Sequence, residues 1–418
     1  MREGASANPL ILGGAQTDFA RNWTREGKSL FELMGAAVRG ALQDAAVDPG
    51  DVGVAHVGNF TGELFCGQGH LGGMFAALDP AFSGVPASRH EAACASGSMA
   101  VLAATADLES GRYDLACVVG VELMKNVDGA TAAKHLGAAL WAGAEATDAR
   151  YPWPRQFSDI ADEYDRRYGL RREHLARLAE LNFANARKNP NAQTRGWTLG
   201  PENFAQDDAA NPLVEGRLRK HDCGQLTDGA ACLLLASPRY AEAWAARTGR
   251  PRGSLSEIRG WGHRTSTLKL ADKLAAAPAD GYLFPNVRRA ITDAYARAGV
   301  AGPEAIDAVE THDCFTITEY LAIDHFGVTP PGQAWRAIED GVIEPGGRLP
   351  FNPSGGLIGA GHPVGATGVR MLVDAHRQVT GTAGDCQVEG ARTVATLNLG
   401  GSATTAAAFV VGRATCAL

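Results

Sequence analysis

The feature that most constrains the fold of this chain is an internal repeat. Residues 38–57 read VRGALQDAAVDPGDVGVAHV, and residues 287–312 read VRRAITDAYARAGVAGPEAIDAVETH. Each copy combines a helical stretch that begins with Val-Arg, a turn that contains Gly and Pro, and a short strand rich in β-branched residues. Two copies far apart in the chain predict two similar domains rather than a solenoid of adjoining repeats.

Both halves continue as alternating helices and strands. An Ala-rich helix after Cys94 precedes a buried-type strand at 115–121, and a helix after Gly365 precedes a strand at 393–399. Such alternation predicts layered α/β domains. The remaining strands are expected at 230–236 and 255–261 in the first half and at 406–411 in the second.

The segment between the halves differs in composition. It holds clusters of aromatic and charged residues, and only 157–188 has helical spacing. An insertion of this length is typically a lid or a binding loop. We therefore expect residues 1–121 and 223–264 to form the first half, 122–222 an inserted loop domain, and 265–418 the second half.

The charge and cysteine content narrow the class of protein. The formal net charge of -7 argues against nucleic acid as the main partner, although a local basic cluster can still bind an anionic small molecule. The chain contains no run of about 18 apolar residues, so we expect no membrane span. The N-terminus also lacks the pattern of a secretory signal. The eight cysteines include no C-x-x-C pair, so we expect reduced thiols in a cytoplasmic protein.

Cys94 is the first candidate catalytic residue, in the sequence RHEAACASGSMA. It comes just before the Ala-rich helix, where the helix dipole is expected to lower the pKa of a thiol. Small neighbours on both sides leave room for a substrate, as a nucleophilic cysteine requires. A small, buried, unreactive cysteine is the alternative, and this segment alone does not decide between the two interpretations.

A glycine-rich segment at 355–368, GGLIGAGHPVGATG, contains the second candidate, His362. Its glycine spacing matches neither the dinucleotide fingerprint nor a P-loop, so neither kind of phosphate site is expected. The glycines instead permit a tight backbone conformation just before a helix. A histidine held there can act as a general base towards a thiol, the alternative being a buried structural histidine.

His312 and Cys314 follow the repeated strand of the second half, in the sequence HDCF. Open α/β sheets bind ligands at the carboxyl ends of their strands, so both side chains are expected at a site. Together with Cys94 and His362 they would also make a Cys₂His₂ zinc set. We favour no metal, because zinc would block the thiolates that nucleophilic chemistry needs.

Gly400 lies at a strand end in the sequence NLGGS. A glycine at this place can bring a backbone N–H close to a bound carbonyl as an oxyanion donor. An ordinary glycine between a strand and a turn is the alternative.

In combination, these motifs resemble those of the thiolase superfamily, and within it the sterol-carrier-protein-2-type and archaeal-type thiolases. The resemblance runs from LILGGAQTDFAR near the N-terminus to NLGGSATTAAAFVV near the C-terminus. It implies an α/β, five-layered α-β-α-β-α fold of two duplicated halves with an inserted loop domain. It also implies coenzyme A and acyl-CoA as substrates, with no permanently bound cofactor.

The resemblance implies a role for each candidate. Cys94 would be the nucleophile that becomes acylated, and His362 would activate it. His312 would help to bind the thioester oxygen together with a water molecule. The N–H groups of Cys94 and Gly400 would form a second oxyanion hole.

Many thiolases carry a second catalytic cysteine two residues before the position of Gly400, where this chain has Asn398. In the sterol-carrier-type branch the cysteine of HDCF takes that acid–base role, which here falls to Cys314. The phosphates of coenzyme A need basic partners in this acidic chain. The candidates are Arg217, Arg219 and Lys220, with a solvated charged surface as the alternative.

The implied function is that of an acyl-CoA C-acyltransferase that makes or cleaves a 3-ketoacyl-CoA carbon–carbon bond through an acyl-Cys94 intermediate. One alternative is a thiolase-fold enzyme with changed chemistry, either an aldolase or an acetyl transfer to a non-CoA acceptor, working with a small OB-fold partner protein. A non-catalytic subunit is the other. The resemblance also implies a homodimer or homotetramer. Trp141, Tyr151 and Trp153 are candidates for the wall of the substrate pocket, or for the core.

Overall fold

The computed structural model describes residues 8–414, apart from the side chain of Arg252. Its main feature is a nine-stranded sheet with the order β3-β2-β4-β7-β1-β8-β11-β10-β9. These strands are β1 (Leu10–Gln16), β2 (Val54–Gly58), β3 (Ala87–His90), β4 (Leu115–Glu122), β7 (Gly229–Ala236), β8 (Ser256–Thr265), β9 (Ala308–Thr311), β10 (Thr393–Gly400) and β11 (Thr405–Arg413). A separate hairpin consists of β5 (Leu213–Glu215) and β6 (Leu218–Arg219).

The α-helices of the described chain surround and separate the strands. They are α1 (Leu30–Ala45), α2 (Gly62–Cys66), α3 (Leu71–Ala76), α4 (Ser96–Glu109), α5 (Gly129–Leu136), α6 (Pro152–Tyr168), α7 (Arg172–Ala186), α8 (Pro238–Thr248), α9 (Leu270–Ala276), α10 (Pro285–Ala298), α11 (Thr316–Phe326), α12 (Ala334–Glu339), α13 (Gly356–Ala360) and α14 (Thr367–Thr380).

The strand order repeats across the sheet. The order β2-β4-β7-β1 in the first half corresponds to β9-β10-β11-β8 in the second. The chain order corresponds as well, because each half runs from a strand to an outer helix (α1 or α10), then to a second strand and an inner helix (α4 or α14). Two antiparallel strands complete each half, β4 with β7 and β10 with β11. The duplication predicted from the sequence repeat is therefore confirmed.

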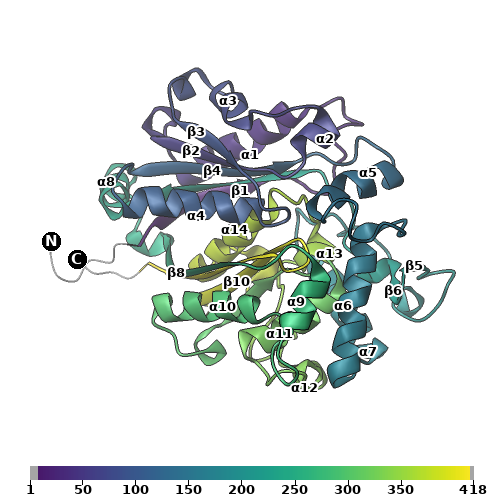
Figure 1. Ribbon diagram of the computed structural model, residues 1–418. Coiled ribbons are helices and arrows are strands. Elements are labelled where there is room, and N and C mark those ends of the chain that lie inside the picture. Colours follow the sequence, from purple (N-terminus) through teal and green to yellow (C-terminus); the bar gives the residue numbers. More distant parts are fainter. Residues whose placement is uncertain (1–7, 415–418) are drawn as a thin grey trace.

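The two halves of the sheet lie in separate layers. β1 joins β8 through only two residue pairs, Leu10 with Glu257 and Ile11 with Ser256. Between the two parts of the sheet lie α4 and α14, of which α14 contacts strands of both (Figure 1). The outer layers contain α1 and α3 on the first half and α10 and α11 on the second. This is the five-layered arrangement that the resemblance predicted.

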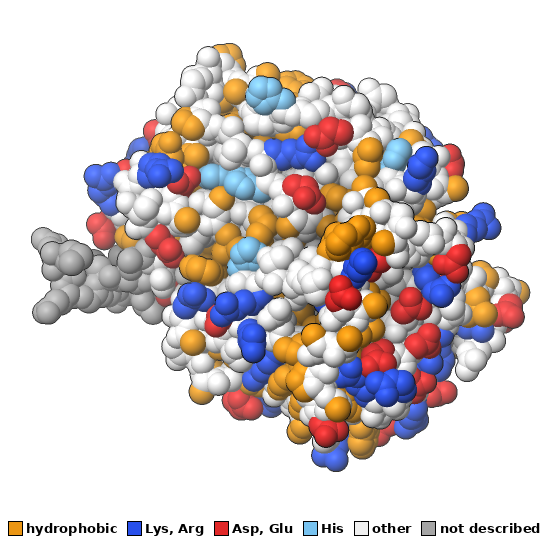
Figure 2. Space-filling model, in the orientation of Figure 1, with side chains coloured by type: hydrophobic (Ala, Val, Ile, Leu, Met, Phe, Trp, Pro, Cys, Tyr) orange, Lys and Arg blue, Asp and Glu red, His pale blue; other side chains and the backbone are white. Residues whose placement is uncertain are grey.

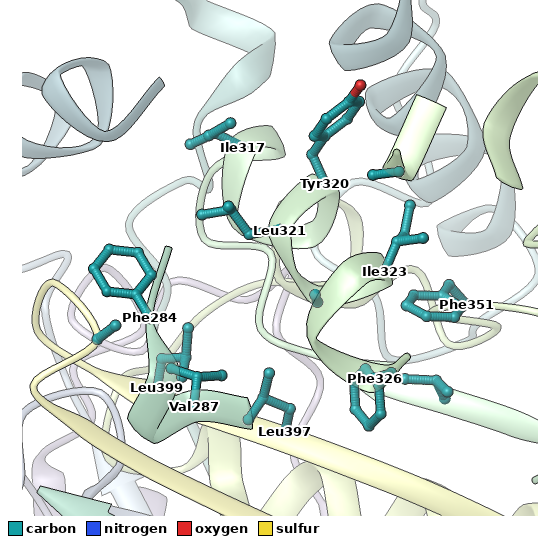
Figure 3. Packing of buried hydrophobic residues seen from close by; sticks show 14 of the residues in the cluster. Phe284, Val287, Ile317, Tyr320, Leu321, Ile323, Phe326, Phe351, Leu397 and Leu399 are labelled. Atoms are coloured by element: carbon teal, nitrogen blue, oxygen red, sulfur yellow. The ribbon is translucent and has the colours of Figure 1, made fainter. Parts of the chain in front are cut away.

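Apolar spacing explains why the helices occupy these layers. In α1, a capping box between Ser29 and Glu32 satisfies the first turn, and the buried residues recur at intervals of three and four. The cluster around Leu33 and Trp244 fills the space between the outer helices and the strands of the first half. The cluster around Leu372 fills the space between the two parts of the sheet. A third cluster packs α10 and α11 against β10 (Figure 3).

One predicted strand belongs to the other half. The run at 255–261 was expected to complete the first half, but β8 pairs with β11 of the second half through nine residue pairs. α10 packs directly on this strand, because a side chain at Gly260 or Gly262 would meet backbone carbonyls of α10 at 2.1 and 1.8 Å. An apolar run predicts a strand but not its partner. By its main pairing, β8 therefore belongs with the strands of the second half, although the prediction placed it with those of the first.

The segment 122–222 covers both halves on the side where the central helices begin. α5 contacts α2 of the first half, whereas α6 and α7 contact α11 of the second. The helical stretch predicted at 157–188 is two helices, because Gly169 ends α6 with a φ of 79°. On the face in Figure 2, acidic and basic side chains are intermixed. Within residues 8–414, no helix combines the length and apolarity needed to cross a bilayer.

Candidate active site

The site lies where the two central helices begin. Cys94 comes two residues before α4, and His362 five residues before α14. The segments approach closely because glycines remove the side chains between them: a Cβ on Gly97 or Gly120 would lie 2.7 or 2.3 Å from the carbonyl oxygen of Gly365. The sequence duplication thus brings together the corresponding ends of α4 and α14, and with them Cys94 and His362.

A strained turn presents Cys94. Ala93 has a φ of 50°, a conformation that residues with a side chain rarely adopt. Ser96 holds the turn, since its hydroxyl accepts a hydrogen bond from the N–H of Ala92 at 3.0 Å and donates one to the carbonyl of Ala93 at 2.6 Å. Strain of this kind is maintained by surrounding structure and recurs at functional sites.

Two histidines face the thiol. The Sγ of Cys94 and one ring nitrogen each of His312 and His362 lie within 4.8 Å of one another. The two imidazole rings are nearly perpendicular, at 89°, with centroids 5.2 Å apart. The structure therefore brings together three of the predicted catalytic residues from three distant parts of the chain.

The hydrogen bonds of His362 define its tautomer. The hydroxyl of Thr367 donates to the carbonyl of Pro363 at 3.2 Å, so it accepts from the Nδ1–H of His362 at 2.7 Å. The Nε2 of His362 is buried and has no partner among the described residues. This nitrogen is consequently an unprotonated acceptor that faces the thiol, as a general base requires.

Asn398 orients His312. Its side-chain oxygen accepts from the hydroxyl of Ser98 at 2.8 Å, so its amide N–H₂ donates to Nδ1 of His312 at 3.1 Å. His312 therefore carries its proton on Nε2 and can donate a hydrogen bond there. The sequence showed Asn398 only as a departure from the usual thiolase cysteine, and gave no sign that it positions the imidazole.

Burial favours the neutral form of Cys94 and of both histidines. It lowers the pKa of His312 to about 3 and that of His362 well below its usual value, with the nearby charge of Arg370 adding to both effects. Burial also raises the pKa of Cys94 to about 12, although the backbone N–H groups of Gly401 and of Cys94 itself favour the thiolate. The prediction of a lowered thiol pKa is wrong, because desolvation outweighs the helix dipole at this depth.

The glycine beside the thiol is Gly401 rather than the predicted Gly400. The N–H of Gly401 reaches Cys94, whereas the Cα of Gly400 faces the carbonyl of Ala92, which a Cβ would meet at 2.2 Å. Gly401 has a φ of 63° and also lines the cavity, so it needs the conformational freedom of glycine. The sequence NLGGS contained both candidates but no signal that separates them.

Cys314 is the second thiol of the site. It lies three residues after β9, is buried, and lines the same cavity as Cys94. Burial raises its pKa well above the usual value, and the proximity of Cys94 raises it further. The neighbouring Asp313 accepts hydrogen bonds from the N–H groups of Leu357 and Ile358 at 2.5 and 3.2 Å, which ties this segment to the glycine-rich turn.

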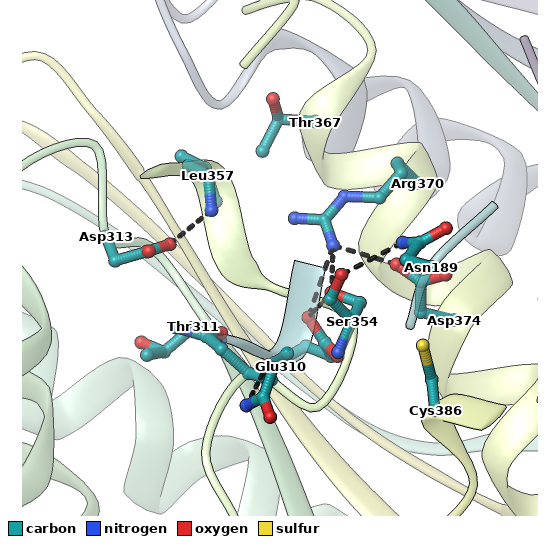
Figure 4. Close-up of polar contacts among 12 residues, drawn as sticks. Asn189, Glu310, Thr311, Asp313, Ser354, Leu357, Thr367, Arg370, Asp374 and Cys386 are labelled. Carbon is teal, nitrogen blue, oxygen red and sulfur yellow. Dashed lines mark hydrogen bonds and ion pairs between the residues drawn. The ribbon is translucent and has the colours of Figure 1, made fainter. Parts of the chain in front are cut away.

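A buried cluster of charged side chains lies next to the site (Figure 4). The guanidinium of Arg370, one turn after Thr367, contacts Glu310 at 3.2 Å and Asp374 at 2.8 Å. Arg370 and Glu310 are fully buried, and the pKa of Glu310 is raised by burial to about 7. The cluster joins β9 to α14, the elements that lead to His312 and His362.

An apolar cavity opens in front of the catalytic groups. Aromatic and aliphatic side chains from the segment 122–222 and from both halves form most of its wall. They are Phe60, Met124, Leu136, Trp153, Phe157, Leu226, Phe315 and Val364. Of the aromatic residues predicted for the pocket, Trp153 is therefore in the wall, whereas Trp141 is 49% exposed at the surface.

The residues predicted to bind phosphate lie elsewhere in the same segment. Arg217 makes ion pairs with Asp162 and Asp165 at 2.7 and 2.8 Å, and Arg219 makes one with Asp208 at 2.7 Å. Lys220 is exposed. Any phosphate contact by the two arginines would therefore compete with carboxylates of the chain itself.

The chain matches two family models. The model of the thiolase N-terminal domain covers residues 10–239, and that of the thiolase C-terminal domain-like family covers residues 271–413. The acetyl-CoA acetyltransferase of Methanothermobacter thermautotrophicus is 32% identical over 408 residues, which are 96% of this chain and 99% of that protein. Human sterol carrier protein 2 is 27% identical over 401 residues, which are 94% of this chain and 69% of that protein.

Solved structures share the fold. An Ltp2-ChsH2(DUF35) aldolase matches with a TM-score of 0.78 at 22% identity, covering 97% of this chain and 98% of that chain. An acetyl-CoA acetyltransferase from Syntrophomonas wolfei matches with a TM-score of 0.69 at 19% identity, covering 98% and 100%. The extent of the family matches and the relative at 32% identity establish that this chain belongs to the thiolase family, whose members include acyltransferase enzymes.

Proposed function

We propose that this chain is an acyl-CoA C-acyltransferase that makes or cleaves the carbon–carbon bond of a 3-ketoacyl-CoA through an acyl group on Cys94. The observation that carries the proposal is the free Nε2 of His362, directed at a site where Cys94, His312 and His362 meet. The relative named acetyl-CoA acetyltransferase supports the same reaction class.

The first half-reaction transfers an acyl group to Cys94. As the Sγ attacks the thioester carbonyl, Nε2 of His362 takes the thiol proton and then returns it to the departing coenzyme A thiolate. The high pKa of the resting thiol makes this base necessary. The N–H groups of Cys94 and Gly401 lie beside the sulfur, where they can stabilise the oxyanion of the tetrahedral intermediate.

The second half-reaction joins two acyl groups. Burial keeps resting Cys314 as a thiol, so it first gives its own proton to solvent. The resulting thiolate removes a proton from C2 of a second acyl-CoA, and Nε2–H of His312 stabilises the enolate oxygen. The enolate attacks the acyl carbon on Cys94, the Cys94 thiolate leaves, and Cys314 returns the proton to it. Cleavage is the reverse.

The proposal extends to the binding of coenzyme A, the cellular compartment and the oligomeric state. Lys220, with Arg217 and Arg219 beside it, would meet the phosphates of coenzyme A. The chain would work in the cytoplasm, since the cysteines within residues 8–414 are all free thiols. It would form a homodimer or homotetramer.

An aldolase with a small partner protein is the second candidate, favoured by the structural likeness to the Ltp2-ChsH2(DUF35) aldolase. At 22% identity this likeness concerns the fold. The thiol pair and both histidines favour acyl transfer over this alternative, because an aldol cleavage needs no acyl-cysteine.

The test is to incubate the protein with acetyl-CoA, longer acyl-CoA compounds and 3-ketoacyl-CoA compounds, and to map acyl adducts by peptide mass spectrometry. We expect an adduct on Cys94 that is absent from Cys94→Ala and present in Cys66→Ala, which removes another half-buried cysteine near the site. No adduct with any donor would overturn the acyl-transfer mechanism. Stoichiometric zinc in the purified protein would do so too, because the same three groups are close enough to bind a metal.

A further inference from the structure

Phe157 of α6 lies between the active-site cavity and a second buried cavity. It lines both. The second cavity lies within the second half, among α6, α10, α11 and β10. Its apolar wall includes Ile160, Phe284, Val287, Leu321, Leu397 and Leu399, of which the last five are shown in Figure 3.

The polar groups at this second cavity are already satisfied. The hydroxyl of Thr318 donates to the carbonyl of Phe315 at 2.6 Å. The ring of His325 bonds through Nδ1 to the carbonyl of Leu321 at 2.6 Å, and its Nε2 accepts from the N–H of Phe284 at 3.2 Å. Apolar cavities without free polar groups stay dry and accept apolar molecules. The wall suits a hydrocarbon group rather than a polar substituent, and the space that it encloses is small, about 10 Å³.

The ring of Phe157 is held firmly in place. Its side chain is buried, and it stacks on Phe315 with centroids 4.4 Å apart and an angle of 26°. Phe315 directly follows the catalytic Cys314 and lines the active-site cavity too. Trp153, one turn earlier in α6, lies near the ring as well, with centroids 6.2 Å apart and an angle of 40° between the planes. A buried side chain that packs against two other aromatic rings acts as a wall rather than as a mobile gate.

We propose that Phe157 sets the upper length of the acyl group that Cys94 accepts, and that the enzyme consequently takes short acyl chains. This inference rests on the proposed acyl transfer at Cys94. An acyl group on the sulfur lies in the apolar cavity, and a chain that grows towards α6 meets the ring of Phe157. Removal of the ring joins the two cavities, and since the second holds only about 10 Å³, most of the room for the end of a longer chain comes from the space that the ring itself occupied.

The test compares chain-length profiles of three variants with that of the wild type. Phe157→Ala removes the wall, and Phe157→Leu removes part of it and serves where the alanine variant fails to fold. Ile160→Ala is the matched control, because Ile160 lies one turn further along α6 and borders only the second cavity. For each protein, kcat/KM is measured with acyl-CoA donors of two to ten carbons.

We expect the ratio of kcat/KM for an eight-carbon donor to that for acetyl-CoA to rise at least tenfold in Phe157→Ala. A smaller rise is expected in Phe157→Leu and none in Ile160→Ala. A profile in the folded Phe157 variants that equals that of the wild type would overturn the inference, as would an equal rise in Ile160→Ala.

A second measurement does not depend on turnover. The rate of alkylation of Cys94 by N-hexyl iodoacetamide, divided by the rate with iodoacetamide, should rise at least tenfold in Phe157→Ala and stay unchanged in Ile160→Ala. Absence of any acyl-Cys94 adduct in the wild type would overturn the proposed function. An unchanged alkylation ratio together with a normal adduct would overturn only the role of Phe157.

Discussion

Whether His362 can act as the base for Cys94 depends on which of its two ring nitrogens carries the proton. Thr367 determines this, because its hydroxyl is committed to the carbonyl of Pro363 and must accept from Nδ1–H. The imidazole could otherwise turn or change tautomer, and Nε2 would no longer be a base. The same logic applies to His312, whose proton is placed on Nε2 by Asn398.

Replacing Thr367 with valine should therefore slow acylation of Cys94 while the fold is kept, since the two side chains have similar shapes. We expect at least a tenfold loss, up to the roughly 10²–10⁴-fold contribution of a general base. Stopped-flow measurement of coenzyme A release gives the acylation rate. Thr380→Val, at the other end of α14, is the control and should retain the wild-type rate. A wild-type rate in Thr367→Val would show that the hydroxyl does not orient the base.

The resting thiol should titrate far above neutral pH. Burial raises the pKa of Cys94 to about 12 and lowers that of His362, so both groups are neutral at pH 7. The thiolate fraction then grows about tenfold for each pH unit below the pKa. The rate of Cys94 alkylation by iodoacetamide should accordingly rise from about pH 7 to about pH 10 without a plateau. A plateau below pH 8 would reveal a thiolate–imidazolium pair instead.

Four catalytic candidates were predictable from the sequence because each stands in a motif that joins a reactive side chain to a strand end or a helix start. Cys94, His312, Cys314 and His362 all line or adjoin the site that the structure shows. The depth of burial was not predictable, and so the direction of the pKa shift of Cys94 was missed. The choice between Gly400 and Gly401 depends on backbone direction within a turn, which residue types alone do not specify.

The geometry of the site depends on how closely β4 and α4 approach the turn before α14. The carbonyl of Gly365 lies against both Gly97 and Gly120, where no side chain fits. The carboxylate of Glu122, at the end of β4, accepts from the N–H groups of Gly365 and Phe60 at 3.1 and 3.0 Å and fixes this approach. Small shifts in these elements are thereby transmitted to His362.

Gly120→Ala should separate these elements. The added Cβ would lie 2.3 Å from the carbonyl of Gly365, so the turn must move. We expect a loss of about 1–3 kcal/mol in the free energy of unfolding, as for overpacked cores. Acylation should fall by about 100-fold, because a displacement near 1 Å has that effect on reacting groups. Gly129→Ala, which has no atom within 4 Å of the added carbon, should change neither quantity. Full activity in Gly120→Ala would contradict this account.

The order of the elements was largely predictable, because hydrophobic period and the repeat identify strands and helices separately. Pairing between strands was less so. β8 has the apolar run of a buried strand, but its nine-pair partner β11 comes some 140 residues later and leaves no trace in the local pattern. The break between α6 and α7 was missed because a single Gly, at 169, interrupts otherwise continuous helical spacing.

The two edge strands of the nine-stranded sheet differ in how far the rest of the chain covers them. The outer edge of β9 is covered by residues 350–352, since the N–H of Val309 donates to the carbonyl of Pro350 and its carbonyl accepts from Asn352. β3 forms the opposite end and pairs only with β2 among the described strands. An uncovered edge strand favours pairing with another chain. A two-fold axis beside β3 would continue the sheet into a second copy and would account for the expected homodimer.

This arrangement predicts that the protein has twice the mass of one chain in solution, and that Ser88 controls the equilibrium. Ser88 is exposed on β3, and a two-fold axis would place the same strand of both copies side by side. Ser88→Asp adds like charges across that pairing, which opposes association, whereas Ser88→Thr adds none. Light scattering after size-exclusion chromatography should show monomers for Ser88→Asp at concentrations where the wild type and Ser88→Thr are dimers. An undiminished dimer in Ser88→Asp would place the contact on another surface, and a monomeric wild type would exclude the homo-oligomer altogether.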